Sequence, residues 1–393
     1  MLCVRGRSPG SVGRIGIPAR SAEGAVRPCK RARGPRRVRT HGVVARLCRP
    51  ASRGAEGVRV TSLDHATVNL LLAAAEFGPA RALTPLTGGK NNRVYRAETE
   101  NGEAVLKAYF RHPNDTRDRL GAEFAFSRFA WASGIHCIPE PLTSNPDAGL
   151  GLFEYVNGRP TTASDVSADL IEQAIEFVRD LNTARWRPLA SRLRVASEAC
   201  FSIAEHLGTV SRRVDRLAAV TDPETAAFVN RELIPIWEEV RSETSDTALS
   251  LDKPLEPTAR CVSPSDFGFH NTLLEADGRV RFLDFEYAGW DDPAKLICDF
   301  FCQPAVPVPG CFFEPFANAI AACFPDPESV VHRARLLMPV YRVKWVCIRL
   351  NEFLPTSSQR RAFSLATNKL EARRATQLNA ARAALHQLQE AAA

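Results

Sequence analysis

Two oxygen-bearing side chains in the stretch 263–286 have the types and the spacing to hold a divalent cation. Asp277-Gly278 predicts a two-residue hairpin loop, because a type I′ turn needs positive φ at both of its central positions. Counting pairs outward from this loop places Asn271 opposite Asp284, and directly opposed residues hold their Cβ atoms about 4.5–5.5 Å apart. Amide and carboxylate oxygens suit Mg²⁺, which takes a few protein oxygens and completes its shell with phosphates and water. The hairpin therefore predicts a magnesium site made by Asn271 and Asp284.

Asp266 lies on the loop that leads into this hairpin, five residues before Asn271. An Asp, an Asn five residues later and a metal-binding Asp after a hairpin follow the order of protein kinases, in which H-R-D-x-x-x-x-N precedes D-F-G. The corresponding pieces here are Asp266, Asn271 and Asp284-Phe285-Glu286. Taken alone, the stretch fits an ordinary surface hairpin with polar ends equally well, so the choice depends on the rest of the chain.

The composition is typical of a soluble globular protein, with 45% apolar and 24% charged residues among 393. This length is enough for two lobes or two domains. No run approaches the roughly 18–20 apolar residues of a membrane span, so we expect no membrane association. The 11 cysteines are scattered without a C-x-x-C pair. An odd count without a signal peptide predicts reduced thiols in a cytoplasmic protein rather than disulfides or structural zinc.

Residues 1–60 form an arginine-rich arm that accounts for the basic charge of the chain. Residues 1–59 hold 15 Lys and Arg against Glu23 and Glu56, so this segment carries +13 and the remainder −6. Its Arg, Gly, Pro and Ser content has no helical or strand period, and we expect it to be disordered.

Three interpretations of the arm remain open: a nucleic-acid-binding arm, a transit peptide, or upstream sequence translated from a start codon assigned too early. The third is favoured, because 44 Arg against 7 Lys indicates a GC-rich gene. The true start would then lie near Val58 or Val60.

Residues 61–157 have the pattern of a small nucleotide-binding lobe. A short helix after Thr61 is followed by alternating residues at 94–98, the hairpin signal Asn101-Gly102 and a returning strand at 104–110. The returning strand carries a lysine at position 107, which alone is usually just an exposed side chain.

A glycine turn precedes this hairpin. Gly88 and Gly89 open the first strand with Asn91 and Asn92 behind them, and such a turn lets backbone N–H groups approach a phosphate. Two glycines are a weak signal, since most such turns are merely turns. The combination of glycine turn, hairpin and Lys107 in the strand is a stronger signal of a phosphate site than any one of the three features.

A helix at 119–133 carries Glu123, 16 residues after Lys107. A solvated helix face is the commoner fate of a glutamate, but kinases pair a strand lysine with a helix glutamate. The apolar strand at 150–156 then ends at Asn-Gly-Arg-Pro, where two lobes would hinge. The backbone groups of Glu154 and Val156 would be free there to bind an adenine edge.

Residues 158–393 have a mainly helical pattern. An apolar stripe runs from 166 to 181, and T-D-P-E at 221–224 predicts a capping box that opens a helix with a bend at Pro235. Further helices are expected at 328–350 and 359–390.

Together these motifs resemble the aminoglycoside phosphotransferase and choline kinase-like family over residues 83–301, and more loosely over the helical C-terminus. The loop that reads H-G-D-x-x-x-x-N in that family keeps its spacing at Asp266, and F-L-D-F-E keeps the metal aspartate. The segment V-R-D-L-N resembles the family's L-x-x-L-H, with Asn182 in place of His. The resemblance implies an α+β protein-kinase-like bilobal fold, with a small N-terminal antiparallel β lobe and a larger, mainly helical C-terminal lobe.

The resemblance also implies ATP and Mg²⁺ as cofactors and a small-molecule hydroxyl compound as substrate. Lys107, held by Glu123, would grip the α- and β-phosphates, and Asp266 would accept the proton of the acceptor hydroxyl. The glycine turn would cover the phosphates, and the hairpin would hold Mg²⁺.

One departure concerns the histidine that buttresses the catalytic loop in kinases, which is Pro264 here. We expect a differently braced loop rather than an inactive enzyme, with Ser263 or Ser265 supplying part of the brace. Pro264 also leaves open the alternative of a regulatory pseudokinase that binds nucleotide. Action on nucleic acid through the arm is disfavoured by the acidic body, and the sequence does not indicate an oligomeric state.

The sequence is compatible with several classes of acceptor. An aminoglycoside, choline, an amino sugar and an ordinary metabolic sugar are all compatible. Asp291, Asp292, Asp299 and Glu352 could line an acidic pocket for a cationic substrate, but bracing of the loop after the hairpin by Asp292 and Asp299 is favoured. Trp345 and Phe353 could stack on a substrate, and their apolar neighbours favour a core position.

Overall fold

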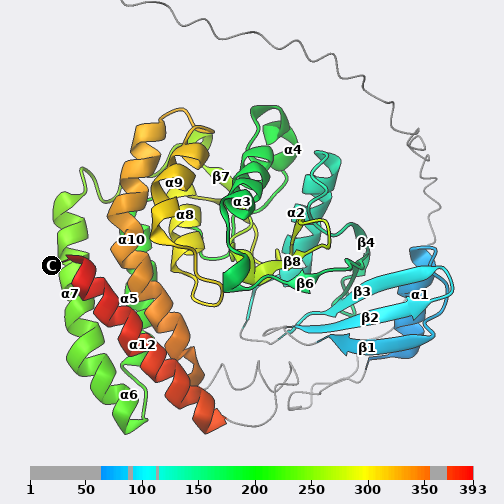
Figure 1. The fold of residues 1–393 in the computed structure, drawn as a ribbon, viewed down its shortest axis with the longest axis horizontal. Coiled ribbons are helices and arrows are strands. Elements are labelled where there is room, and N and C mark those ends of the chain that lie inside the picture. The colour runs from blue at the N-terminus through cyan, green and yellow to red at the C-terminus, as the bar shows by residue number, and fades with distance from the viewer. Residues whose placement is uncertain (1–62, 87–91, 112–114, 355–369, 393) are drawn as a thin grey trace, which may run out of the picture. The chain divides into compact units, whose positions relative to one another are not determined.

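The computed structural model describes residues 63–86, 92–111, 115–354 and 370–392, which Figure 1 draws as a coloured ribbon. They form a small sheet lobe followed by a larger lobe that is mainly helical, as the predicted fold class requires. The basic arm and the glycine turn with Gly88, Gly89 and Asn91 lie outside the described residues.

The small lobe is built on a five-stranded antiparallel sheet with the order β1-β2-β3-β5-β4. Its strands are β1 Ala82–Leu86, β2 Arg93–Thr99, β3 Gly102–Ala108, β4 Pro141–Asn145 and β5 Leu150–Glu154. Helix α1, His65–Ala74, begins where the Asp64 side chain accepts the N–H groups of Ala66 and Thr67. Its apolar face packs on the sheet in one core with Leu106 and Leu152.

Helix α2, Arg119–Ala132, contributes to the cores of both lobes. Leu120 and Phe124 pack in a cluster with Phe153 of β5. Phe126 and Phe129 belong to the large core of the helical lobe. Glu123 of α2 is therefore held by packing on both sides.

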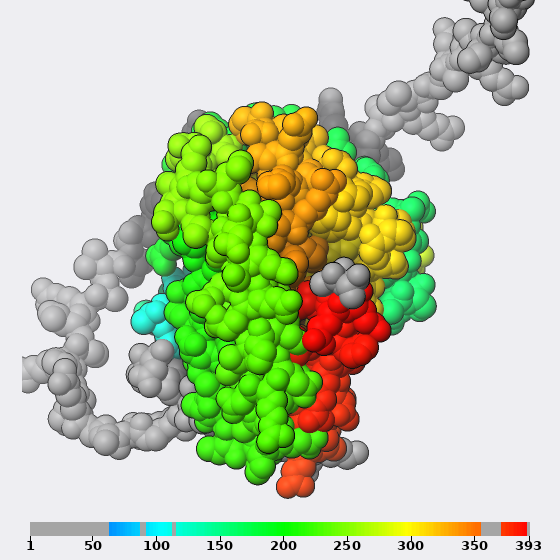
Figure 2. Space-filling view, turned by 90° about the vertical axis from the view of Figure 1, so that its left-hand side faces the viewer, coloured from blue at the N-terminus to red at the C-terminus, as the bar shows by residue number. Residues whose placement is uncertain are grey.

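The helical lobe is arranged around the long helix α10, which contacts α5, α7, α8, α9 and α12. Figure 2 shows α12 (red) lying beside the α5–α7 segment (green) and α10 (orange). The helices are α3 Ala168–Leu181, α4 Arg187–Ala190, α5 Ile203–Leu217, α6 Pro223–Phe228, α7 Ile234–Thr247, α8 Pro293–Cys302, α9 Phe313–Ala321, α10 Pro327–Arg349 and α12 Leu370–Ala392.

Five short strands also belong to this lobe. They are β6 Arg159–Pro160, β7 Cys261–Ser263, β8 Thr272–Leu274, β9 Val280–Phe282 and β10 Gly289–Asp291. Strands β6, β8 and β9 form one small sheet, and β7 pairs with β10 in another. These strands carry the segments that the sequence predicts to be functional.

The predicted register of the β8–β9 hairpin is wrong by one residue. Leu274 pairs with Val280, and the N–H of Leu283 donates to the main-chain oxygen of Asn271 at 2.9 Å. The cause is the turn. Gly278 has φ +86°, whereas Asp277 is not among the residues with positive φ, so the loop is a three-residue turn instead of type I′. Asn271 therefore stands opposite Leu283, one residue before Asp284.

The helix predicted to start with the box T-D-P-E also differs in detail. The side chain of Asp222, rather than Thr221, accepts the N–H of Thr225 at 2.9 Å. The predicted bend at Pro235 is a π-helical turn at Val229–Leu233, between α6 and α7. Proline has no N–H and clashes with the carbonyl four residues before it, so a wider turn relieves the conflict.

Candidate active site

Lys107 and Glu123 form a buried ion pair between β3 and α2. The Nζ atom of Lys107 lies 2.8 Å from both carboxylate oxygens of Glu123, and the hydroxyl of Tyr109 donates to Oε2 at 2.6 Å. Burial raises the pKa of the Glu123 carboxyl against the opposing effect of the lysine. Burial alone would lower the pKa of Lys107, but Asp284 and Glu123 raise it above its usual value. The pair fixes the Lys107 ammonium group where the small lobe faces the helical lobe.

Asp284 reaches this cation from the other lobe. Its Oδ1 atom lies 2.9 Å from Lys107 Nζ, and the side chain is 35% exposed. The backbone at Asp284 has φ +66°, a conformation that costs a non-glycine residue roughly 1–2 kcal/mol. In this conformation the Asp284 carboxylate contacts Lys107 of the small lobe.

The loop with Asp266 is braced by side chains from two other segments. The hydroxyl of Ser263 accepts the N–H of Ser265 at 3.0 Å, and this matches the brace expected where Pro264 replaces a histidine. Asn182, at the end of α3, accepts the N–H of Val262 at 2.8 Å and donates to its carbonyl at 3.1 Å. The Asn182 amide thus ties α3 to β7 immediately before the loop.

Asp266 is half-buried, with 36% of its side chain exposed. Asn271 donates from Nδ2 to the main-chain oxygen of Asp266 at 2.9 Å. His270 Nε2 lies 3.3 Å from Asp266 Oδ1. Burial would raise the pKa of Asp266, but the contact with His270 brings this pKa below its usual value. Sequence analysis did not single out His270; its position four residues after Asp266 was the available signal.

Asn92 and Glu286 meet between the lobes. Asn92 Nδ2 donates to Glu286 Oε2 at 2.7 Å, and its Oδ1 accepts the N–H of Phe110 at 3.3 Å. The Asn92 amide, predicted to lie near phosphates, is therefore engaged with protein groups. Glu286, which sequence analysis noted only as part of Asp-Phe-Glu, is 1% exposed and 3.7 Å from the Arg119 guanidinium.

Only part of the predicted adenine contact is open. The N–H of Glu154 donates to the Glu140 carbonyl at 2.9 Å, and its carboxylate accepts from Arg281 at 2.6 Å. This N–H is thus not free, contrary to the expectation. Val156 is 6% exposed and has no backbone hydrogen bond within the described part of the chain.

The four carboxylates considered for an acidic substrate pocket are buried, with exposed fractions of 0–8%. Asp291 pairs with Lys295, and Asp292 pairs with Arg333 and with His206 Nε2 at 3.1 Å. Asp299 accepts from Lys344 Nζ at 2.7 and 2.8 Å and from the Trp345 indole at 2.9 Å. Glu352 lies 3.9 Å from Arg373.

These contacts correct the acidic-pocket interpretation and agree with the bracing one. Each of the four carboxylates faces a cation of the chain itself. Phe353 packs against the large core as expected, whereas Trp345 is half-buried and outside that cluster.

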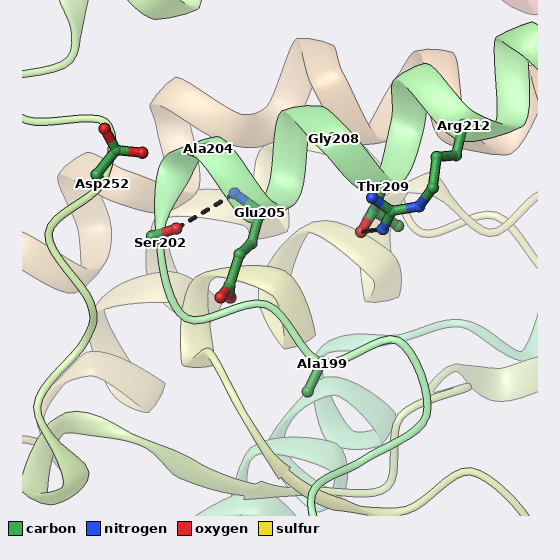
Figure 3. Close-up of a pocket in the computed structure, with 8 residues that line it drawn as sticks. All are labelled: Ala199, Ser202, Ala204, Glu205, Gly208, Thr209, Arg212 and Asp252. Atoms are coloured by element: carbon green, nitrogen blue, oxygen red, sulfur yellow. Dashed lines mark hydrogen bonds between the residues drawn. The ribbon is translucent and has the colours of Figure 1, made fainter.

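A separate hollow of about 580 Å³ lies at the start of α5. Figure 3 shows its eight lining residues, and none of the predicted site residues is among them. The polar groups in it bond locally: Ser202 accepts the N–H of Glu205, and Arg212 donates to Thr209. The hollow therefore adds nothing to the site around Asp266.

Comparison with known proteins identifies the family. Residues 82–301 match the model of the Phosphotransferase enzyme family, APH, over more than half of the chain. The chain belongs to this family. The predicted family is confirmed, and the main predicted extent of the resemblance, 83–301, agrees closely with the match. A search of curated proteins finds no match.

Solved structures confirm the fold. A choline/ethanolamine kinase family protein from Mesorhizobium loti aligns with TM-score 0.51 and 18% identity, over 80% of this chain and 93% of that one. Choline kinase LicA from Streptococcus pneumoniae aligns with TM-score 0.51 and 12% identity, over 82% and 100%. A spectinomycin phosphotransferase, APH(9)-Ia, solved with ADP and spectinomycin, gives 0.51 and 11%, over 82% and 99%.

At these identities the likeness shows the fold alone, and the family match shows a phosphotransferase of small-molecule type. Among the described helices, none is both long and apolar enough to cross a bilayer.

Proposed function

We propose that this phosphotransferase moves the γ-phosphoryl group of ATP to a hydroxyl of a small molecule, with Asp266 as the base. One observation carries the proposal: an unbroken series of contacts joins the predicted residues. Glu123 bonds Lys107 at 2.8 Å, and Lys107 bonds Asp284 at 2.9 Å. The residue before Asp284 bonds Asn271 at 2.9 Å, and Asn271 bonds Asp266 at 2.9 Å.

The donor set fits Mg²⁺. Asn271 Nδ2 points to the main-chain oxygen of Asp266, so the amide oxygen Oδ1 is turned away from that contact. The Asp284 carboxylate is partly exposed in the same region. One amide oxygen and one carboxylate are the hard ligands that Mg²⁺ takes beside phosphate oxygens and water. Bound there, the ion would neutralise charge on the transferring phosphoryl group.

Phosphoryl transfer depends on positioning and charge stabilisation more than on covalent chemistry. Lys107, held by Glu123, supplies a fixed positive charge for the α- and β-phosphates. Asp266 accepts the hydroxyl proton and orients the attacking oxygen in line. A pKa below the usual value keeps Asp266 ionised at neutral pH, as a base must be. The spectinomycin phosphotransferase solved with ADP supports an adenine nucleotide as donor.

The acceptor is proposed to be a hydroxyl compound that does not depend on a cationic group. Choline and aminoglycosides are cations, and carboxylates without a cation of the chain beside them would favour their binding. The four candidate carboxylates instead each face a lysine, an arginine or a histidine of the chain. An uncharged sugar or polyol fits these surroundings better. The pseudokinase alternative was suggested by Pro264, which replaces the bracing histidine. It is less favoured, because Ser263 and Asn182 brace this loop instead.

The experiment compares the wild-type chain with Asp266→Asn. ATP and Mg²⁺ together should raise the melting temperature of both proteins more than either ligand alone; ligand at about 100 times Kd adds roughly 2.7 kcal/mol of stability. ATP turnover should fall by orders of magnitude in Asp266→Asn only. Full turnover in this variant would refute the assignment of the base.

The acceptor is tested with matched pairs, choline against 3,3-dimethylbutan-1-ol and glucosamine against glucose. The uncharged member of each pair should have a kcat/KM at least as high as that of the cation. A preference for the cation that weakens with added salt would contradict the proposed acceptor class.

A further inference from the structure

The imidazole of His270 contacts the proposed base, and the proposed function gives it no positioning role. Its Nε2 atom lies 3.3 Å from Asp266 Oδ1. The contact arises from the 3-10 turn Phe269–Asn271, which brings the chain back toward Asp266. The main chain of Asp266 is held separately by Asn271 Nδ2 at 2.9 Å. The carboxylate and the main chain of Asp266 are thus each tied to a different residue of one turn.

The ring of His270 lies beside Gly268. A Cβ atom on Gly268 would lie 2.9 Å from His270 Nδ1 and 2.8 Å from Gln303 Cγ, so the ring and the Gln303 stem occupy the space beside the glycine. Gln303 is 1% exposed, and its amide bonds the backbone of Ala305 and Val306. A buried, anchored side chain and a glycine backbone therefore limit how far the imidazole can turn.

The two ring nitrogens have different surroundings. Nδ1 is buried and has no hydrogen-bond partner within the described part of the chain. An ionised carboxylate only accepts hydrogen bonds, so Nε2 must carry the hydrogen in the contact with Asp266. Of the two carboxylate oxygens of Asp266, Oδ1 is the one that His270 contacts. A fixed Oδ1 also fixes the direction of Oδ2, which can then face an acceptor hydroxyl.

We infer that His270 is a positioning residue that orients Asp266 for phosphoryl transfer. The resemblance assigns the brace of this loop to a histidine two residues before the aspartate, where this chain has Pro264. His270 follows Asp266 in the sequence, whereas position 264 precedes it, and it supplies a brace from that part of the loop. This inference rests on the proposed function, because a base needs a defined orientation only if it receives a proton.

The test measures steady-state turnover of ATP by the full chain, with the best acceptor or with water. His270→Ala should lower kcat by about 10- to 100-fold, because a small misplacement of a reacting group can cost about 10²-fold in rate. The KM for ATP should stay within about twofold, since His270 is not part of the nucleotide contacts. His270→Gln should recover part of kcat, because its amide N–H can reach the place of Nε2. His332→Ala, at an exposed position of α10, is the matched control and should match the wild type.

A second variant keeps the histidine and moves it. Gly268→Ala should displace the ring and lower kcat in the same direction, with the KM for ATP again unchanged. If His270→Ala and Gly268→Ala both keep full kcat while Asp266→Asn is inactive, the inference about His270 is overturned and the proposed function stands. If Asp266→Asn is fully active, the proposed function itself fails.

A spectroscopic measurement tests the contact without turnover. In a long-range ¹H–¹⁵N spectrum, the signals lost in His270→Gln should have the pattern of the Nε2-protonated tautomer. These signals should move in Asp266→Asn and stay in place in His332→Ala. A different tautomer, or signals unaffected by Asp266→Asn, would overturn the inference.

Discussion

Lys107 Nζ lies 2.9 Å from Asp284 Oδ1 while it also bonds both carboxylate oxygens of Glu123 at 2.8 Å. One ammonium group is thus shared by two carboxylates from different lobes. Asp284 is the proposed metal ligand, so this residue connects the lysine of the nucleotide lobe to the metal site. The ion pair can hold the two halves of the site in register before any ligand is present.

Replacing this lysine should cost stability. Lys107→Met leaves the buried Glu123 carboxylate without its cation, and breaking a buried ion pair typically costs about 3–5 kcal/mol. Adding Glu123→Gln should recover part of the loss, because the uncompensated charge is then removed. Urea unfolding monitored by circular dichroism measures both variants.

The control for Lys107 is an ion pair in water. Arg81 and Glu100 are paired with 64% and 66% of their side chains exposed, and Arg81→Met should have no measurable effect. Equal effects of Lys107→Met and Arg81→Met would contradict the interpretation of the buried pair.

Asn182 should be important for the loop before Asp266. Asn182→Ala removes both hydrogen bonds to Val262 and leaves its buried N–H and C=O unpaired. An unsatisfied buried polar group costs about 1–3 kcal/mol, so we expect a loss of that order in urea unfolding. Turnover should fall as well, because β7 leads directly into the loop. Thr183→Ala, which removes an exposed hydroxyl bond on the same helix end, is the control. Equal stability of the two variants would argue against a bracing role for Asn182.

The turn at Gly278 offers a clean test of backbone conformation. A Cβ at Gly278 or at Gly310 would have nothing within 4 Å, but only Gly278 has positive φ, at +86°. Gly278→Ala should therefore destabilise the protein by about 1 kcal/mol or more through its conformation alone, and Gly310→Ala should be neutral or slightly stabilising. Urea unfolding of the two variants gives the comparison. A loss of the same size at both positions would mean that side-chain contacts, not φ, decide the cost.

The sequence predicts those parts of the site that depend on local spacing. The pairing of Lys107 with Glu123 was expected from the kinase pattern of a strand lysine and a helix glutamate, here 16 residues apart, and the structure shows that contact. The hairpin of Asn271 and Asp284 was recognised, but its register was wrong. Asp277-Gly278 fits two turn types, and only the three-dimensional structure shows that one residue rather than two has positive φ.

Contacts that join distant segments could not be predicted from the sequence. Asn92 bonds Glu286, 194 residues away, and Asp299 bonds Lys344, 45 residues away. The sequence around a carboxylate does not show whether a cationic side chain from another helix will lie beside it. The acidic pocket was therefore an alternative that the sequence left open. The packing of α8 against α10, which pairs Asp299 with Lys344, argues against it.

The pair of His206 and Asp292 should make stability depend on pH. His206 is fully buried, which would lower its pKa, but the hydrogen bond to Asp292 raises this pKa to about 9. A group whose folded pKa lies above its unfolded value of about 6.5 stabilises the protein below that value, and the contribution is lost as pH rises through the folded pKa. The free energy of unfolding should therefore decrease between about pH 6.5 and pH 9. Burial would raise the pKa of Asp292, but His206 and Arg333 bring it to about 2, so its contribution is lost only in strong acid.

The measurement is urea unfolding at half-unit steps from pH 6 to pH 9.5 for the wild type and His206→Gln. The variant keeps a hydrogen-bond donor for Asp292 but has no ionisable group, so its free energy of unfolding should vary less over this window. His386→Gln is the control, because His386 is exposed on α12 and its replacement should leave the wild-type pH dependence in place. An unchanged slope in His206→Gln would show that another group titrates, because only the removal of the responsible group can flatten the profile.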